Sequence, residues 1–422
     1  MSRAETALAP RASSAPAVAI VRRHWGVILS GVVWVLLVVN FSRLAVISGD
    51  ESVQYRFVQR LFGDVPDAVG YYFGLGLVEA PFYAVGSALD AAGLHTVDGQ
   101  PVHGAAIALG LGLLMLAAWP LLAAVIGGLG LRYAGFSILA AAVGMPFLFY
   151  ASFVPGKNHA LDALLFTAAI YLSYRYFRQP RPEPWVPYAL GAVFGLAYTV
   201  RYFDGAAAVA LVLVLLWFRR WADAALIAVT SAVVCLLLFA IPWAYGVPVF
   251  SGGYKAENLI VFAPLNPLRM LFTNHRGLFV WSPVSVLAAI GLVLLFVRRP
   301  EWRRFLTAVT AMAVAIVASY SLIGFWDGTW SFSQRFYTPL FPLVAIGLAG
   351  LLDAAPRFGL VAASLAALWT AFLMFNLEVI GGPQYTNTIS GGATDLARLP
   401  ATTHTSPGAY LWGLKHKSNL LR

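Results

Sequence analysis

The first residues that could do chemistry are two adjacent carboxylates, Asp50 and Glu51, in the stretch Ser48-Gly49-Asp50-Glu51. They follow an apolar run over residues 25–47, which is long enough to cross a bilayer because a spanning helix needs about 20 mostly apolar residues. Carboxylates at the membrane surface are costly unless water, a cation or a catalytic task keeps them there. A carboxylate in this place can serve as a general base; the alternative is a helix that simply ends in acidic residues.

A second group of residues consists of cations close to the ends of apolar runs. Arg22 and Arg23 precede the first run and predict a cytoplasmic N-terminus, since Arg and Lys concentrate on the inner side of a membrane. Counting spans from there places six cations on the outer side, where this rule disfavours them: Lys157, Arg201, Lys255, Arg269, Arg276 and Arg335.

Cations held against the topological rule suggest that this side binds an anion. Arginine suits phosphate oxygens because its guanidinium group offers paired donors. The alternative is that each cation pairs with a nearby outer carboxylate, and we expect Asp204, one turn from Arg201, to neutralise that arginine.

Composition sets the class of the protein. Hydrophobic residues make up 60% of the 422 residues and charged residues only 11%, which excludes a soluble globular protein, where charged residues are near 25%. The mean hydropathy is +0.76. The net charge of +10 is spread over short loop clusters, so it sets membrane topology, and we expect no nucleic-acid partner. The single cysteine, Cys235, leaves no disulfide to consider.

Hydropathy predicts an all-α polytopic membrane protein with a bundle of about 11 transmembrane helices. Residues 1–21 are predicted to be a disordered cytoplasmic tail, 22–380 the transmembrane domain, and 381–422 a short extracytoplasmic tail. Two outer segments are long, at 48–103 and 245–281. The first should carry amphipathic helices on the outer face, and we expect 71–92 to form a surface-lying or re-entrant helical pair rather than a span.

Four stretches carry a resemblance to a known family. Gly49-Asp50-Glu51 resembles the acidic motif in the first outer loop of GT-C fold integral-membrane glycosyltransferases. Residues 276–283, Arg-Gly-Leu-Phe-Val-Trp-Ser-Pro, are similar to the RGLFxxSP segment of the family 39-like branch. Residues 330–339 resemble its WSFGPRYLLP segment, with Ser333-Gln334 in place of Gly-Pro. Thr199-Val200-Arg201 resembles another recurrent arginine position.

The chain also departs from the family pattern elsewhere, and the outer C-terminal domain common among larger relatives is reduced to about forty residues. Many relatives carry an acidic residue in the outer loop after the third span, where this chain reads Gly156-Lys157-Asn158-His159. The usual Pro-Pro pair of the first outer region is Glu79-Ala80-Pro81. The resemblance therefore says least about the acceptor.

The resemblance implies an enzyme that moves a sugar from a polyprenyl-phosphate donor to a hydroxyl of a glycolipid, glycan or protein, with mannose as the default sugar. It places the base of this inverting transfer in the acidic pair, and we predict that Asp50 is the base and that Glu51 orients the base or the acceptor. Spacing alone does not choose between them, because adjacent helical residues point about 100° apart.

The remaining site residues fall into two predicted groups. The donor phosphate is assigned to Arg201, Arg276 and Arg335, with Lys157 and Lys255 in support. The acceptor or sugar is assigned to Glu79, His159, His275, Tyr71 and Trp330. For these histidines a structural role is the alternative, and for the aromatic residues it is the interfacial belt. No metal-ligand spacing such as His-x-x-x-His occurs, so no cofactor is predicted, and a divalent cation is left open.

Two other functions fit a polytopic chain. A transporter or flippase for a polyprenyl-linked sugar would typically show internal repeats with broken helices in matching halves, and the sequence shows no such symmetry. A non-catalytic scaffold would leave the acidic pair and the outer arginines without a role. We therefore predict a multi-pass enzyme of the plasma (inner) membrane, with its active site and C-terminus outside. Its partners would be the lipid-linked donor, the acceptor and membrane lipids.

Overall fold

The structure, a computed structural model, describes residues 16–41, 50–68, 72–95, 101–153, 157–249, 266–273, 276–322 and 332–375. Within these ranges the regular elements are helices, apart from one isolated bridge between His95 and Pro101. The predicted all-α class is therefore confirmed. The tails predicted at 1–21 and 381–422 lie mostly or wholly outside the described residues.

The described residues up to 249 form ten α-helices. They are α1 (Pro16–Phe41), α2 (Asp50–Phe62), α3 (Phe73–Ala91), α4 (Val102–Leu114), α5 (Ala118–Gly128), α6 (Ala134–Gly144), α7 (Asn158–Arg178), α8 (Trp185–Val200), α9 (Gly205–Trp217) and α10 (Trp221–Ala244). The second half adds α12 (Asn266–Phe272), α13 (Leu278–Trp281), α14 (Val284–Arg298), α15 (Arg303–Ser321), α16 (Phe341–Ala354) and α17 (Pro356–Phe375). Short 3₁₀ turns at Tyr202–Asp204 and Arg335–Leu340 precede α9 and α16.

Helix length and composition agree with a polytopic membrane protein. Among the described residues, five helical stretches are long and apolar enough to cross a membrane: 102–128, 221–244, 300–321, 335–354 and 356–374. Five shorter apolar helices accompany them, in α1, α6, α8, α9 and α14. Helix α3 is not in either group, and it is one continuous helix containing Pro81 rather than the helical pair that the sequence suggested.

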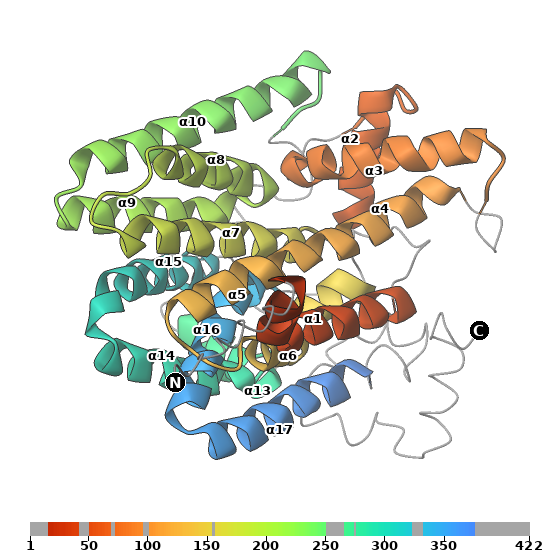
Figure 1. Ribbon diagram of the computed structural model, residues 1–422. Coiled ribbons are helices and arrows are strands. Elements are labelled where there is room, and N and C mark those ends of the chain that lie inside the picture. The colour runs from red at the N-terminus through yellow and green to blue at the C-terminus, as the bar shows by residue number, and fades with distance from the viewer. Residues whose placement is uncertain are drawn as a thin grey trace, which may run out of the picture.

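Helix α7 runs through the middle of the bundle (Figure 1). It contacts α8 on one side and α5, α15 and α16 on others. Helices α8, α9 and α10 form one edge of the molecule, and α14, α16 and α17 lie toward the opposite edge (Figure 1). Because neighbours surround α7, most of its side chains are buried, including the polar Asn158, His159 and Asp162.

Close backbone contact joins α14 to α16. A Cβ atom on Gly291 would lie only 1.8 Å from the carbonyl oxygen of Gly347. Within a membrane, small residues at such crossings allow helix backbones to approach and gain van der Waals contact. The contact fixes α16, and with it the 3₁₀ turn that leads into this helix.

The bundle has two chemically different ends. At one end Asn158 at the start of α7 donates to the Val200 carbonyl at the end of α8 (3.3 Å), and Tyr150 donates to the Phe332 carbonyl (3.3 Å). At the other end Arg299 approaches Asp353 at 3.4 Å, and Tyr176 near the end of α7 donates to Asp223 at 2.5 Å. Residues predicted for opposite sides of the membrane thus lie at opposite ends of the bundle.

Candidate active site

Arg201 forms the centre of the first of these ends. Helix α8 stops at Val200 because Arg201 has an extended backbone (φ −153°, ψ 113°). Its side chain is only 2% exposed, and Nη1 lies 2.9 Å from Oδ2 of Asp162. The guanidinium carbon lies 4.5 Å from the ring centroid of Tyr320 and 5.4 Å from that of Phe336. A buried arginine held in this way has a fixed position and orientation.

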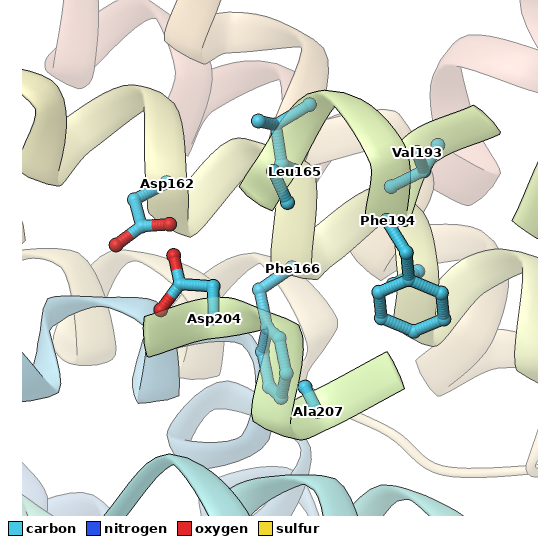
Figure 2. Close-up of a pocket in the computed structure, with 9 residues that line it drawn as sticks. Asp162, Leu165, Phe166, Val193, Phe194, Asp204 and Ala207 are labelled. Carbon is cyan, nitrogen blue, oxygen red and sulfur yellow. The ribbon is translucent and has the colours of Figure 1, made fainter. Parts of the chain in front are cut away.

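The expectation that Asp204 neutralises Arg201 is wrong in its main point. Asp162 makes the direct ion pair, and Oδ1 of Asp204 instead accepts a hydrogen bond from the Tyr320 hydroxyl at 2.8 Å. Since Arg201 is extended, the helical spacing that predicted the pair does not apply. Asp204 remains within electrostatic range of Arg201, and its carboxyl points toward that of Asp162 at the edge of a small pocket (Figure 2).

Arg335 lies beside Arg201 on the same aromatic ring. It begins the 3₁₀ turn before α16 and is 4% exposed. Its guanidinium carbon is 5.2 Å from the ring centroid of Phe336, whose ring also contacts Arg201. Phe336 in turn stacks on Tyr320, with centroids 5.1 Å apart and planes at 10°. Aromatic faces attract cations, so this pair of rings holds two predicted phosphate ligands close together.

His159 and Lys157 join this cluster from the start of α7. The His159 ring is buried and packs on Tyr150, with centroids 4.5 Å apart. Lys157, Arg201 and Arg335 all lie within electrostatic range of His159. The structure thus brings together four residues that the sequence assigned to donor, acceptor or sugar binding, from three separate parts of the chain.

Arg276 lies in the turn before α13 and is 1% exposed. Its φ of 65° is a left-handed conformation, which costs a residue with a side chain energy that surrounding contacts must supply. The helix that follows it packs against the segment before Arg335, where Trp281 and Phe332 have ring centroids 5.8 Å apart and the hydroxyls of Ser282 and Ser333 are 3.5 Å apart. Arg276 therefore belongs to the same end of the bundle.

Glu79 on α3 is only 3% exposed and lies within electrostatic range of Tyr55 on α2. Its neighbour Tyr55 has its pKa raised to about 12, first by burial and then by the charges of Asp90, Asp64 and Glu79. Tyr83 joins these residues through a short hydrogen bond to Asp64.

The acidic pair marks the first turn of α2, which begins at Asp50. The side chains of Asp50 and Glu51 lie outside the described residues, as do Lys255, His275, Tyr71 and Trp330. Helix α2 packs on α3 through Phe57 and Phe73, with ring centroids 6.1 Å apart. The start of α3 packs closely against the end of α8, two residues before Arg201. A Cβ atom added to Gly74 would lie 2.3 Å from Oγ1 of Thr199.

Metal binding was left open by the sequence. In the part of the chain that the structure describes, no group of three or more His, Cys, Asp or Glu side chains is arranged to hold a metal ion.

Sequence reasoning missed Asp162, Tyr320 and Phe336, which hold Arg201 in place. A signal for Asp162 was present, because this carboxylate stands inside the apolar run 161–177. Ionisable residues within a membrane segment are rare and usually functional or paired. The two rings carried no comparable signal, since aromatic residues are common throughout the chain.

Residues 94–245 match the family model described as dolichyl-phosphate-mannose-protein mannosyltransferase. The crystal structure of ArnT from Cupriavidus metallidurans bound to undecaprenyl phosphate is similar in fold over 96% of this chain and 78% of that chain, with a TM-score of 0.53 and 16% sequence identity. No curated protein sequence matches the chain.

The family match, which covers less than half of the chain, and the shared fold support a glycosyltransferase of the GT-C type. The class predicted from the acidic motif and the arginine-containing segments is therefore confirmed. The family match covers α4 to α10, which includes Asp162 and Arg201.

Proposed function

We propose that this glycosyltransferase moves a sugar from a polyprenyl-phosphate donor to an acceptor hydroxyl on the extracytoplasmic side of the membrane. Two likenesses support such a donor: ArnT was crystallised with undecaprenyl phosphate, and the family model is named for dolichyl-phosphate mannose. Mannose is accordingly the first sugar to test. A glycolipid, glycan or protein hydroxyl is the acceptor class.

The observation that carries the proposal is the contact of both Arg201 and Arg335 with the Phe336 ring at one end of a membrane bundle. Burying cations in a membrane protein is costly unless anions accompany them. Asp162 supplies one such anion to Arg201. A lipid phosphate would add a second anion to this end of the bundle, where Arg335, Arg276 and Lys157 also lie.

Each group has a distinct role in this proposal. Asp162, Tyr320 and Phe336 fix Arg201, so that Arg201 positions the site and adds to its field. Arg335 and Arg276 donate hydrogen bonds to the phosphate oxygens. Guanidinium groups in fixed positions stabilise the charge that develops on a departing phosphate without reorganising during the reaction.

The acidic pair at the start of α2 supplies the base. A carboxylate of Asp50 or Glu51 accepts the proton of the acceptor hydroxyl. The hydroxyl oxygen forms a bond to the anomeric carbon from the face opposite the phosphate, and the bond from that carbon to the phosphate oxygen breaks. The electron pair leaves with the phosphate, so the products are the glycosylated acceptor with inverted anomeric configuration and the polyprenyl phosphate.

A donor panel tests the proposal. Purified protein in lipid nanodiscs should release sugar from at least one labelled polyprenyl-phosphate sugar, with mannose, glucose, galactose and arabinose compared. It should leave nucleotide sugars untouched, and mass spectrometry of the products identifies acceptor and linkage. Movement of intact donor across proteoliposomes with no glycosylated product would contradict the proposal and favour a flippase.

Cysteine labelling tests which end faces outward. In a Cys235→Ser background, Asp67→Cys and Arg181→Cys introduce thiols at exposed positions near α2 and at the opposite end. An impermeant maleimide added to intact cells should label position 67 and spare position 181. The reverse pattern would place the arginine cluster in the cytoplasm and contradict an extracytoplasmic active site.

A further inference from the structure

A second cavity, of about 660 Å³, opens between α1, α5 and α6. It lies at the end of the bundle opposite the arginine cluster. Leu131 lines the cavity, and a Cβ atom added to the preceding residue, Gly130, would lie 3.7 Å from Nη1 of Arg299. Arg299 in turn pairs with Asp353 at the C-terminal end of α16. The cavity is therefore separate from the proposed active site.

The inner wall of this cavity is apolar. Val33, Ala123 and Leu139 line it. Its one inward hydroxyl, Ser30, is already engaged: it donates to the Val27 carbonyl at 2.8 Å and accepts from the Trp119 indole nitrogen at 3.0 Å. Since these polar atoms are satisfied within the protein, the wall favours hydrocarbon as its occupant.

The mouth of the cavity is basic and aromatic. Arg132 and His24 lie there with exposed side chains, and neither has an ion-pair partner among the described residues. Trp25 and Tyr133, which are 63% and 40% exposed, flank them. Aromatic residues of this kind favour the membrane interface, and basic pockets between transmembrane helices bind anionic lipid headgroups.

We propose that this cavity is a binding site for an anionic phospholipid, with the headgroup phosphate at Arg132 and His24 and one acyl chain along Val33, Ala123 and Leu139. The volume lies in the range of about 300–1,000 Å³ found for ligand sites. A cavity with apolar walls and a cationic mouth is complementary to an anionic amphiphile. A zwitterionic lipid has no net charge and is attracted less strongly by Arg132 and His24.

The lipid would also steady the first helix. Helices α1 and α6 touch closely at the cavity, since a Cβ on Gly135 would lie 2.1 Å from the Gly26 carbonyl oxygen. A lipid that bridges α1 to α5 holds α1 on the bundle, and α1 is the helix that precedes the acidic pair in the chain. This inference does not rest on the proposed transfer reaction.

Native mass spectrometry of the full chain, exchanged into phosphatidylglycerol or phosphatidylcholine, tests the site. We expect phosphatidylglycerol to be retained preferentially. Arg132→Gln should weaken its binding about fivefold, because one basic residue near a membrane surface contributes about 1 kcal/mol to anionic lipid binding. Gly127→Leu should also reduce binding, since a Cβ at this lining position meets no atom within 4 Å and points into open space.

Arg357→Gln is the matched control. Arg357 is exposed and starts α17 at the same end, but it does not line the cavity, so its removal should leave binding unchanged. Quenching of Trp25 fluorescence by brominated phosphatidylglycerol, measured as the difference from Trp25→Phe, localises the lipid. Equal retention of both lipids, or an equal effect of Arg132→Gln and Arg357→Gln, would overturn the proposal. Stronger phosphatidylglycerol binding after deletion of residues 1–15 would overturn it too, because it would show that these residues of the chain itself occupy the cavity.

Discussion

Nη1 of Arg201 lies 2.9 Å from Oδ2 of Asp162, and both side chains are only 2% exposed. The pair joins the end of α8 to the first turns of α7 across 39 residues of sequence. Because Lys157 immediately precedes α7 and His159 lies in its first turn, this ion pair sets the relation between two cation-bearing segments. It therefore gives the site a fixed framework around which Arg335 and a phosphate can be placed.

Asp162→Asn should destabilise the protein strongly. Removing one partner of a buried ion pair typically costs about 3–5 kcal/mol, because the other charge stays buried without compensation. Thermal unfolding in detergent measures the loss. The double variant Asp162→Asn/Arg201→Gln should recover part of it, since the unpaired Arg201 charge is then removed as well.

The matched control for this prediction is Asp353→Asn, which breaks the more exposed contact with Arg299. Exposed pairs contribute about 0–1 kcal/mol, so its effect should be small. An Asp162→Asn protein as stable as the wild type would show that the Arg201 pair does not hold the two helices together.

Arg335→Gln should reduce the use of the lipid donor without unfolding the protein. A hydrogen bond to a charged group contributes about 1.5–3 kcal/mol, which corresponds to a fall of about 10- to 100-fold in kcat/KM for the donor. Initial rates over a range of donor concentrations measure it, with the melting temperature recorded alongside. Arg357→Gln, which removes an arginine far from the site, is the control, and an unchanged donor dependence in Arg335→Gln would count against a phosphate role.

Asp90 should confer an acid-sensitive contribution to stability. Burial alone would raise the pKa of Asp90, but hydrogen bonds from the Val102 N–H and from His103 lower it overall below the ordinary value of 3.8. The Val102 N–H lies 2.6 Å from Oδ1, so the carboxylate caps the start of α4. A depressed pKa means that this stabilisation is complete above the unfolded-state pKa and is lost as the pH falls through the folded-state value.

Asp90→Ala should therefore cost about 1 kcal/mol at pH 7, as loss of a helix cap does. The difference in melting temperature between this variant and the wild type should shrink below about pH 4, where the unfolded-state carboxyl protonates. Asp67→Ala, at an exposed position between α2 and α3, is the control. A difference that stays constant down to pH 3 would contradict the capping role of the ionised form.

Much of the helical architecture follows from hydropathy, and so does the position of Arg201, Arg276 and Arg335 near helix ends. Long apolar runs and short basic loops can be read from the local sequence, because they do not depend on how the helices pack against one another. The acidic pair was likewise placed at a helix boundary, and α2 begins at Asp50.

The partners of these residues could not be predicted in the same way. Asp162 reaches Arg201 across 39 residues, and Tyr320 reaches Asp204 across 116, so both contacts depend on how helices pack. The predicted pair of Arg201 with Asp204 assumed a helical turn that the extended Arg201 backbone breaks. Local spacing thus located the charged residues, whereas tertiary packing decided which of them pair.

The most direct test of the central claim is sugar transfer from a labelled polyprenyl-phosphate donor by purified Asp50→Asn, Glu51→Gln and the double variant. If the acidic pair at the start of α2 supplies the base, at least one single variant and the double variant should lose about 10²–10⁴-fold in turnover while still binding the donor. Full turnover by all three variants would contradict the account.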